Sequence, residues 1–564
     1  MQQCNKATLV LLHGVIFTAN AKNTVCEAIA VRENAILYVG TSDEAARYID
    51  AETTVIDLQG KMVLPGLIDS HIHPPGLSLS QLYEVQLLGK HSIPGYVEAV
   101  REFYRIHPEV KAIYGRGWSW SDLQGEEAIC GPRKEYLDAV TTDIPVILRS
   151  SDGHTLWVNS KALEMNGITA ATVSPPGGEI IRHSGTGELW GTLKESAMRL
   201  LPLAEYSPCQ YEDAMKLFQR EMHSYGITAI LSFSSMVVDT LFQALKKMEE
   251  GGTLQMHVCG ALAFQPTEEL KQQLERFDCL HHLYQSPLLK IRTAKFFADG
   301  VVEGGTSCLC EPYSSVLGKG SSYRGEFLWD MDKLKTAFSA VTEKGIQIHV
   351  HSTGDQATAN VLDALQYVKD NGRPNDCRHT ITHLQLVRDQ DLERFRDLQV
   401  IASVQPYWHC KGPGWWQDVD FRLLGERAKH EFPLGSFFRH DVVVASSSDY
   451  IATLVPNPFV AMQIGVTRNL HNGSEYGVYT ITDMDDPQYL LNKQERATIV
   501  QMIRSFTINN AYALFMEEET GSLETGKRAD FIVIDQNVLA IDPLAIGQTK
   551  VLMTFFGGKL VYSQ

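Results

Sequence analysis

Short apolar runs alternate with amphipathic segments through the middle of the chain, and this pattern predicts strands joined by helices. The helical segments include Met331–Lys344, Ala357–Asn371 and Lys493–Ala513. The apolar runs short enough to be barrel strands are Gly66–Ser70, Pro145–Arg149, Thr228–Ser232, Ala294–Asp299, Gln347–His351, Thr380–Thr382, Ile401–Val404 and Val442–Ser446. Eight strands alternating with helices predict an α/β fold of the (β/α)8 TIM-barrel type, with insertions.

The two ends of the chain have a different pattern. Residues 1–65 contain short β-prone runs separated by Gly, Asn and Asp, which is typical of small antiparallel sheets. Residues 519–564 have the same texture, with a long apolar run at Val551–Tyr562. We therefore expect both termini to form one small β-sandwich domain, while residues 66–518 form the barrel domain. The stretch 75–143 is expected to be an insertion.

Composition narrows the class of protein. The chain has 564 residues, with a globular mixture of 44% hydrophobic and 21% charged residues. Its formal net charge of −17 argues against a nucleic-acid partner and against an anionic membrane surface. The first apolar run is too short for a signal peptide, and no window approaches the roughly 18 apolar residues of a membrane helix. The ten scattered cysteines fit reduced thiols, so we expect a cytoplasmic protein.

Imidazole and carboxylate side chains follow several of the predicted strands. His71 and His73 come directly after the first strand, and alternate residues of a strand project to the same side. His351, His383 and Asp449 follow later apolar runs in the same way. The His71–His73 pair alone could also be two hydrogen-bonded loop histidines. Five such residues at strand ends, where barrel enzymes carry their chemistry, indicate a site for zinc, iron, manganese or nickel.

Two further polar residues lie in the predicted strands. Lys295 opens the run Phe296–Ala298, and a lysine at the start of a strand is usually solvated or paired. The residue pattern alone therefore gives Lys295 no role. His349 precedes His351 by two positions and shares its face. A partner of the site and a satisfied core histidine are equally good interpretations of His349.

The motifs resemble those of the amidohydrolase superfamily. The segment Leu64–His73 is similar to the opening metal motif of that superfamily. Later segments resemble signatures of its family 3, which includes the N-substituted formamide deformylases; these segments are Lys295–Gly300, His351–Asp355, Thr382–Val387, Ser448–Asp449 and, as the closing element, Gly521–Asp530. The resemblance covers nearly the whole chain, and its motifs occur in the expected order.

The resemblance implies a site for one or two divalent metal ions, with zinc as the expected metal. Lys295 would bridge two ions as a carbamate, and Lys290, five residues earlier, is the competing lysine. With an unmodified Lys295 the site would carry one ion. The implied metal ligands are His71, His73, Lys295, His351, His383 and Asp449.

The segment Ser151–Ser160 is similar to a family segment at the mouth of the barrel. The resemblance implies that His154 and Asn159 hydrogen-bond a substrate carbonyl and that Trp157 forms a wall of the pocket. His154 would also stabilise an oxyanion during catalysis. Arg468 could reach an anionic substrate group, although a structural salt bridge is the commoner role.

These roles imply hydrolysis of a non-peptide C–N bond, of amide or formamide type, in a small molecule. Metal-activated water would attack, with Asp449 as general base. A deaminase on the same scaffold is an alternative, but such enzymes usually use a Glu beside the third histidine, and none closely follows His351 or His383. A non-catalytic regulatory protein is a third interpretation. Assembly into a homo-oligomer stays open.

Overall fold

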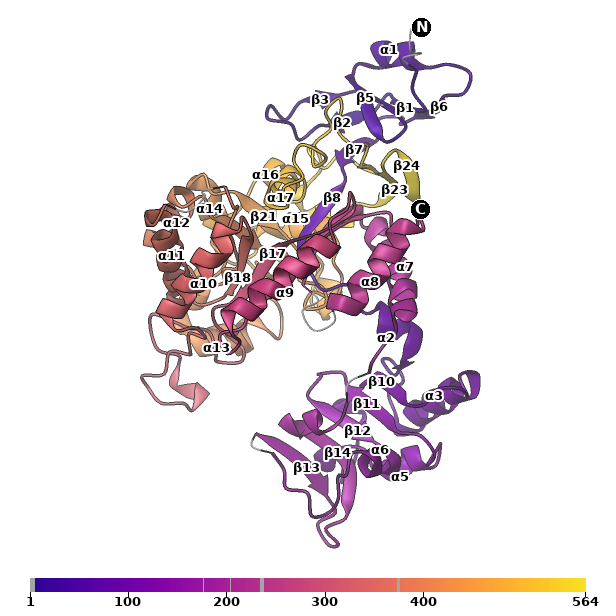
Figure 1. Ribbon diagram of the computed structural model, residues 1–564, viewed down its shortest axis with the longest axis vertical. Helices are drawn as coiled ribbons and strands as arrows, with labels where there is room; N and C mark the ends of the chain where they lie inside the picture. Colours follow the sequence, from indigo (N-terminus) through magenta and orange to yellow (C-terminus); the bar gives the residue numbers. More distant parts are fainter. Residues whose placement is uncertain (1–5, 176, 203, 234–237, 373–375) are drawn as a thin grey trace. The chain divides into compact units, whose positions relative to one another are not determined.

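A computed structural model describes residues 6–175, 177–202, 204–233, 238–372 and 376–564. The chain divides into two compact units. The first unit contains residues 1–74 and 216–564, and the second contains residues 75–215. Both units are drawn in Figure 1, coloured along the sequence.

A barrel of eight parallel strands forms the centre of the first unit, which confirms the predicted fold. Each barrel strand pairs in parallel with the barrel strand that follows it in the sequence. The side-chain amide of Asn510 donates to the carbonyls of Ile68 and Ser446, and so joins the first strand to the last. The strands are β8 (Leu67–Ile72), β15 (Ile227–Ser232), β16 (His257–Ala263), β17 (Leu289–Phe297), β18 (Gln347–Ser352), β19 (Thr380–His383), β20 (Ile401–Val404) and β21 (Val444–Ser446).

Amphipathic helices pack against these strands. Helix α10 begins where Asp330 caps the backbone N–H groups of Asp332 and Lys333, and it buries an apolar face at helical spacing. In Figure 1 the helices α9, α10 and α11 lie beside β17 and β18. The helices of the barrel are α7 (Pro208–Ser224), α8 (Val238–Glu250), α9 (Leu270–Leu283), α10 (Met331–Glu343), α11 (Asp355–Asp370), α12 (Asp389–Asp397), α14 (Leu434–Arg439), α15 (Pro458–Thr467), α16 (Ile499–Ser505) and α17 (Ile508–Ala513).

Two predictions about individual elements were wrong. The run at Pro145–Arg149 forms β11 (Val146–Ser150), which belongs to the sheet of the second unit, and the barrel instead contains β16. Apolar periodicity identifies a strand but not the sheet in which it pairs. The predicted helix Lys493–Ala513 is divided into α16 and α17, because Thr507 has a non-helical backbone. Within the described ranges, no helix combines the length and apolar composition needed to cross a bilayer.

Strands from both termini build the sandwich beside the barrel. Strand β22 (Phe531–Ile534) pairs antiparallel with β7 (Met62–Pro65), so the C-terminal segment completes an N-terminal sheet. One sheet has the order β5 (Ala35–Gly40), β4 (Ala28–Arg32), β1 (Leu9–Leu12) and β6 (Thr54–Asp57). The other has the order β24 (Lys559–Ser563), β23 (Val551–Phe556), β22, β7, β2 (Val15–Phe17) and β3 (Val25–Cys26). Domain boundaries at residues 65 and 519 stay a prediction.

The second unit is an α/β module with its own core. It begins at Pro75, as does the predicted insertion, and continues past Asp143 to Met215. Helix α3 (Ile93–Ile106) and β11 contribute to its core around Trp118. Its sheet has the order β13 (Gly178–Arg182), β14 (Leu189–Glu195), β12 (Thr155–Val158), β11, β10 (Ile113–Trp118) and β9 (Val85–Gln86).

A buried carboxylate joins the sandwich to the barrel. Asp530 Oδ2 lies 3.3 Å from Nε2 of His257, the first residue of β16, and both side chains are buried. Its Oδ1 accepts from the backbone N–H of Gly557 at 2.7 Å, and its carbonyl accepts from Gly66 N at 2.9 Å. Burial raises the pKa of Asp530, but the hydrogen bond to His257 and the charges of His257 and Arg528 hold it below its ordinary value.

We expect Asp530→Ala to lower the free energy of unfolding by about 3–5 kcal/mol, because it leaves His257 buried without its partner. A depressed carboxyl pKa contributes stability above the unfolded pKa of about 3.9, and this contribution is lost as the pH falls through the folded pKa. The difference in melting temperature between wild type and variant should therefore shrink as the pH falls below about 4. Asp43→Ala, at an exposed position of the sandwich, is the control. A constant difference over this range would contradict the assignment.

Candidate metal centre

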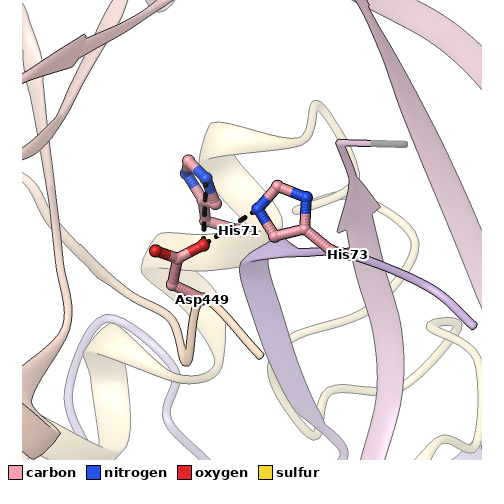
Figure 2. Close-up of side chains that lie close together, drawn as sticks. All are labelled: His71, His73 and Asp449. Atoms are coloured by element: carbon pink, nitrogen blue, oxygen red, sulfur yellow. Dashed lines mark hydrogen bonds and ion pairs between the residues drawn. The ribbon is translucent and has the colours of Figure 1, made fainter. Parts of the chain in front are cut away.

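Three side chains converge at the C-terminal ends of β8 and β21. His71, His73 and Asp449 place one ligand atom each within 4.8 Å of one another. Asp449 Oδ1 lies 2.9 Å from His73 Nε2 and 3.6 Å from His71 Nε2, as Figure 2 shows. The His71 side chain is buried, whereas the His73 side chain is 41% exposed. The group therefore has the donors of a metal site and is open on one side.

Backbone hydrogen bonds between the first and last strands hold this group together. Asp449 N donates to His71 O at 2.8 Å, and His73 N donates to Tyr450 O at 2.9 Å. Asp69 is buried below them and accepts from the N–H groups of His71 and Ser448, each at 3.1 Å. Burial outweighs these hydrogen bonds and raises the pKa of Asp69 to about 7.

His351 and His383 form a second pair beside the first group. Their ring centroids lie 4.4 Å apart, and the His383 ring lies 5.1 Å from that of His71. Both His383, with φ of 76°, and Asp449, with φ of 54°, have left-handed backbones, which cost non-glycine residues about 1–3 kcal/mol. Strained backbones at two strand ends are typical of a functional site.

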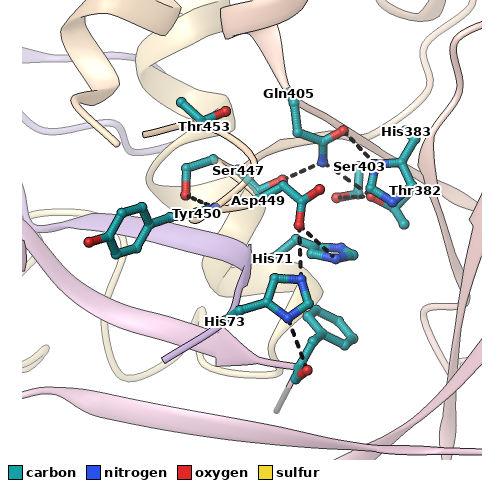
Figure 3. A network of polar contacts seen from close by, with 12 residues as sticks. His71, His73, Thr382, His383, Ser403, Gln405, Ser447, Asp449, Tyr450 and Thr453 are labelled. Atoms are coloured by element: carbon teal, nitrogen blue, oxygen red, sulfur yellow. Dashed lines mark hydrogen bonds and ion pairs between the residues drawn. The ribbon is translucent and has the colours of Figure 1, made fainter. Parts of the chain in front are cut away.

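In each of three histidine rings, one nitrogen lies within hydrogen-bond distance of an oxygen acceptor. His73 Nδ1 lies 3.0 Å from Phe233 O, and His351 Nε2 lies 2.9 Å from Gly300 O. His383 Nδ1 lies 3.0 Å from Gln405 Oε1, as Figure 3 shows. Each contact requires a proton on that nitrogen and leaves the other nitrogen to offer a lone pair. Metal-binding histidines in proteins are held in this way.

Both nitrogens of His73 face oxygen atoms, Phe233 O on one side and Asp449 Oδ1 on the other. A neutral ring has one N–H group, so only one of these contacts is a hydrogen bond from a neutral imidazole. A cation between Nε2 and Oδ1 satisfies the second contact. The donor set therefore fits a divalent metal.

The buried histidines are neutral at neutral pH, as metal binding requires. Burial lowers the pKa of His351 to about 4, with a smaller effect from the charge of Lys295. Burial likewise holds the pKa values of His71 and His383 well below the ordinary value, and neighbouring positive charge adds to the effect.

Lys295 lies inside the barrel and is 3% exposed. No described residue accepts a hydrogen bond from its Nζ, which lies 4.6 Å from the ring centroid of Phe233 and 5.2 Å from that of Phe297. Burial lowers the pKa of Lys295 to about 7, although the charge of Asp449 opposes this shift. Lys290 instead lies at the start of β17, where Nζ is 3.2 Å from Glu519 Oε1. Of the two lysines, Lys295 is therefore the one that the barrel encloses.

A second buried carboxylate positions the loop after His351. Asp299 accepts from the backbone N–H groups of Cys308, Thr353 and Gly354 at 2.9, 3.1 and 2.8 Å. Burial raises the pKa of Asp299 to about 7 despite these bonds. A Cβ at position 354 would lie 2.0 Å from Cys308 O, so this close crossing requires glycine. Asp299 therefore supports His351 and is not the partner of Lys295.

The residues predicted to bind substrate lie in the second unit. The His154 side chain is exposed, and its Nδ1 lies 3.2 Å from Glu195 Oε2. Trp157 is buried and donates to Arg133 O at 2.9 Å. Asn159 is buried as the cap of α6 (Ser160–Met165). The roles predicted for His154, Trp157 and Asn159 at the substrate stay predictions.

The motif analysis missed two residues of the site, Gln405 and Phe233, and the structure also decides the role of Arg468. Gln405 fixes the proton of His383, but it lies in no motif that marks it. The Phe233 ring stacks against His71 with centroids 4.1 Å apart. Arg468, considered for an anionic substrate, is fully buried and donates to the carbonyls of Leu491 and Glu431, both at 3.0 Å. Its contacts are structural.

A parallel barrel with histidine and aspartate donors at its strand ends defines a class of metal-dependent hydrolases. Residues 54–562 match the Amidohydrolase family, so the chain belongs to that family, as the motifs predicted. It is 27% identical to the putative amidohydrolase YtcJ of Bacillus subtilis, over 98% of both chains. It is 25% identical to the N-substituted formamide deformylase of Arthrobacter pascens, over 99% of this chain and 98% of that one.

A solved structure supports the same class. An uncharacterised metal-dependent hydrolase from Pyrococcus furiosus is 25% identical, with a TM-score of 0.72, and the match covers 94% of this chain and 99% of the other. The protein is therefore a metal-dependent hydrolase, as predicted.

We expect protein that has never met a chelator to contain one or two divalent ions per chain by elemental analysis. Chelation should lower the melting temperature, because ions that bind only the native state stabilise it, and adding metal back should restore it. His73→Ala should reduce the metal content, whereas His13→Ala, at an exposed position of the sandwich, should not. Folded wild type without metal would overturn the assignment.

Proposed function

We propose that the protein hydrolyses a C–N bond of amide or formamide type in a small molecule. The observation that carries this proposal is the set of oxygen atoms that face one ring nitrogen of each of three histidines. His73, His351 and His383 each keep one nitrogen for a metal, beside the carboxylate of Asp449. The formamide deformylase similar to this chain over nearly its full length supports the bond type.

We assign the metal to one or two divalent ions, with zinc favoured by a donor set of imidazoles and carboxylate. His71, His73 and Asp449 would hold one ion, and His351 and His383 would hold the second. A carbamate on Lys295 would bridge them. Carbamate formation joins a neutral amine to carbon dioxide and releases one proton, and a buried lysine with a pKa of about 7 supplies neutral amine at neutral pH.

Asp449 is the proposed general base. A bound divalent ion would lower the pKa of a water molecule and polarise the scissile carbonyl. The Asp449 side chain is 13% exposed, so part of it is accessible to solvent beside His73. It would accept the proton of the attacking water and deliver it to the leaving nitrogen. The left-handed backbone at Asp449 and its bond to His71 O keep the carboxylate at this position.

The loop after Asp449 connects the metal group to a candidate substrate surface. Thr453 Oγ1 accepts from Trp408 Nε1 at 3.0 Å. The Trp408 ring is nearly parallel to that of His383, with centroids 6.0 Å apart. Thr453 N donates to Asp449 O at 3.4 Å, and Figure 3 shows both residues. The loop therefore has a fixed contact beside a metal ligand.

This loop presents apolar side chains to solvent. Ile451, Leu454 and Val455 are 40%, 68% and 56% exposed. Apolar side chains exposed beside a polar centre are typical of ligand-binding surfaces, where they contact the apolar part of the ligand. We therefore propose that the substrate is a small N-acyl or N-formyl amine with an apolar substituent.

A panel of N-formyl and N-acetyl amines tests this function. Wild type should release amine from compounds with apolar substituents faster than from those with charged substituents, and a chelator should abolish the release. Asp449→Asn should keep the fold and lose about 10²–10⁴-fold in kcat, because an amide cannot accept the proton. Asp441→Asn is the matched control, because Asp441 lies in the turn before β21, the strand that precedes Asp449.

Turnover of Asp449→Asn within a few-fold of wild type would assign the base to another residue. Release of ammonia from aminated aromatic rings, without cleavage of any amide, would support the deaminase alternative instead.

The bridge is tested by Lys295→Ala. The variant should lose one metal ion per chain and most activity, because an anionic bridge offsets the repulsion of two divalent ions. Acetate should restore part of both. Lys290→Ala removes a lysine that pairs with Glu519 and should keep its metal. Unchanged metal content with a lowered melting temperature in Lys295→Ala would show a structural lysine.

A further inference from the structure

His71 differs from the other three histidines in the residue that contacts its second nitrogen. The partners of His73, His351 and His383 are oxygen atoms, which can only accept from a ring N–H. The partner of His71 Nδ1 is His349 Nε2, at 3.1 Å. A histidine nitrogen either donates or accepts, so this contact alone leaves two arrangements of the proton.

Only one of these arrangements lets His71 offer a lone pair to a metal beside Asp449. His71 Nε2 is the nitrogen on the Asp449 side, 3.6 Å from Oδ1. If His349 donated the proton, His71 would carry its own proton on Nε2 and could not bind metal there. If His71 Nδ1 donates to His349 Nε2, then His71 Nε2 is free and the proton of His349 lies on Nδ1.

Packing holds the two rings in this contact. His349 is 1% exposed and lies in β18, where it is opposite Lys295 of β17 in the parallel register. The Phe233 ring contacts both imidazoles, with centroids 4.1 Å from His71 and 4.6 Å from His349. Phe233 therefore packs against both rings, and this packing in the barrel core favours the observed orientation of the pair.

We propose that His349 is a positioning residue of the metal centre, which accepts the Nδ1 proton of His71 and so presents His71 Nε2 to the metal. His349 acts through His71 and does not itself bind the ion. This inference rests on the proposed role of His71 as a ligand. Losing such a partner typically weakens metal binding by about 10–100-fold.

The test compares two substitutions of His349. His349→Gln retains a carbonyl oxygen that can accept from His71, whereas His349→Leu fills similar space without an acceptor. Zinc affinity of each variant is measured by competition with a chromophoric chelator, together with metal content and melting temperature. His223→Leu removes another buried histidine, which donates to Gln255 O away from the strand ends, and controls for the loss of packing alone.

We expect His349→Leu to bind zinc about 10–100-fold more weakly than wild type, and His349→Gln to stay within a few-fold of wild type. His223→Leu should lose melting temperature without losing zinc affinity. Wild-type affinity in folded His349→Leu, or an equal loss of affinity in both His349 variants, would overturn the inference. Wild type that binds no zinc or other divalent metal would instead refute the proposed function, so the two failures are distinguishable.

Discussion

The geometry of the site depends on the hydrogen bonds that join the end of the first barrel strand, β8, to the segment after the last one, β21. Asp69 accepts from the backbone of His71 and Ser448, and Asp449 donates to the carbonyl of His71. These residues are far apart in sequence, yet one buried carboxylate fixes both chain segments. Without this connection, Asp449 would not be held beside the His71 ring. Placing a carboxyl group here costs desolvation free energy, which hydrogen bonds from two backbone N–H groups offset in part.

The site combines neutral rings with charged groups in a buried environment. Burial keeps the histidines unprotonated, and the oxygen partners of three rings decide which nitrogen offers a lone pair. The same burial lowers the pKa of Lys295, which has no described hydrogen-bond acceptor. The apolar surroundings, which include Phe233 and Phe297 beside Lys295, therefore favour the neutral forms of both the histidines and the lysine. It leaves imidazoles able to bind metal and an amine able to react.

Much of the fold was predictable because strand and helix periodicities are local properties. The runs at β18, β19 and β20 are short and contain β-branched residues, so their local pattern predicts barrel strands. Val146–Ser150 has the same local pattern but pairs with β10 and β12 in the second unit. The sheet to which this strand belongs is determined by pairing with distant segments, and the periodicity of one segment does not predict that pairing.

The sequence by itself determined the barrel, the terminal sandwich and the strand-end positions of His71, His351, His383 and Asp449. These follow from local patterning and from motifs in the expected order. Only the tertiary structure decided which ring nitrogens face oxygen atoms, that His349 contacts His71, and that Lys295 and not Lys290 lies inside the barrel. The physical reason is that protonation and burial depend on partners brought together from distant strands, and no single segment of the chain contains both partners.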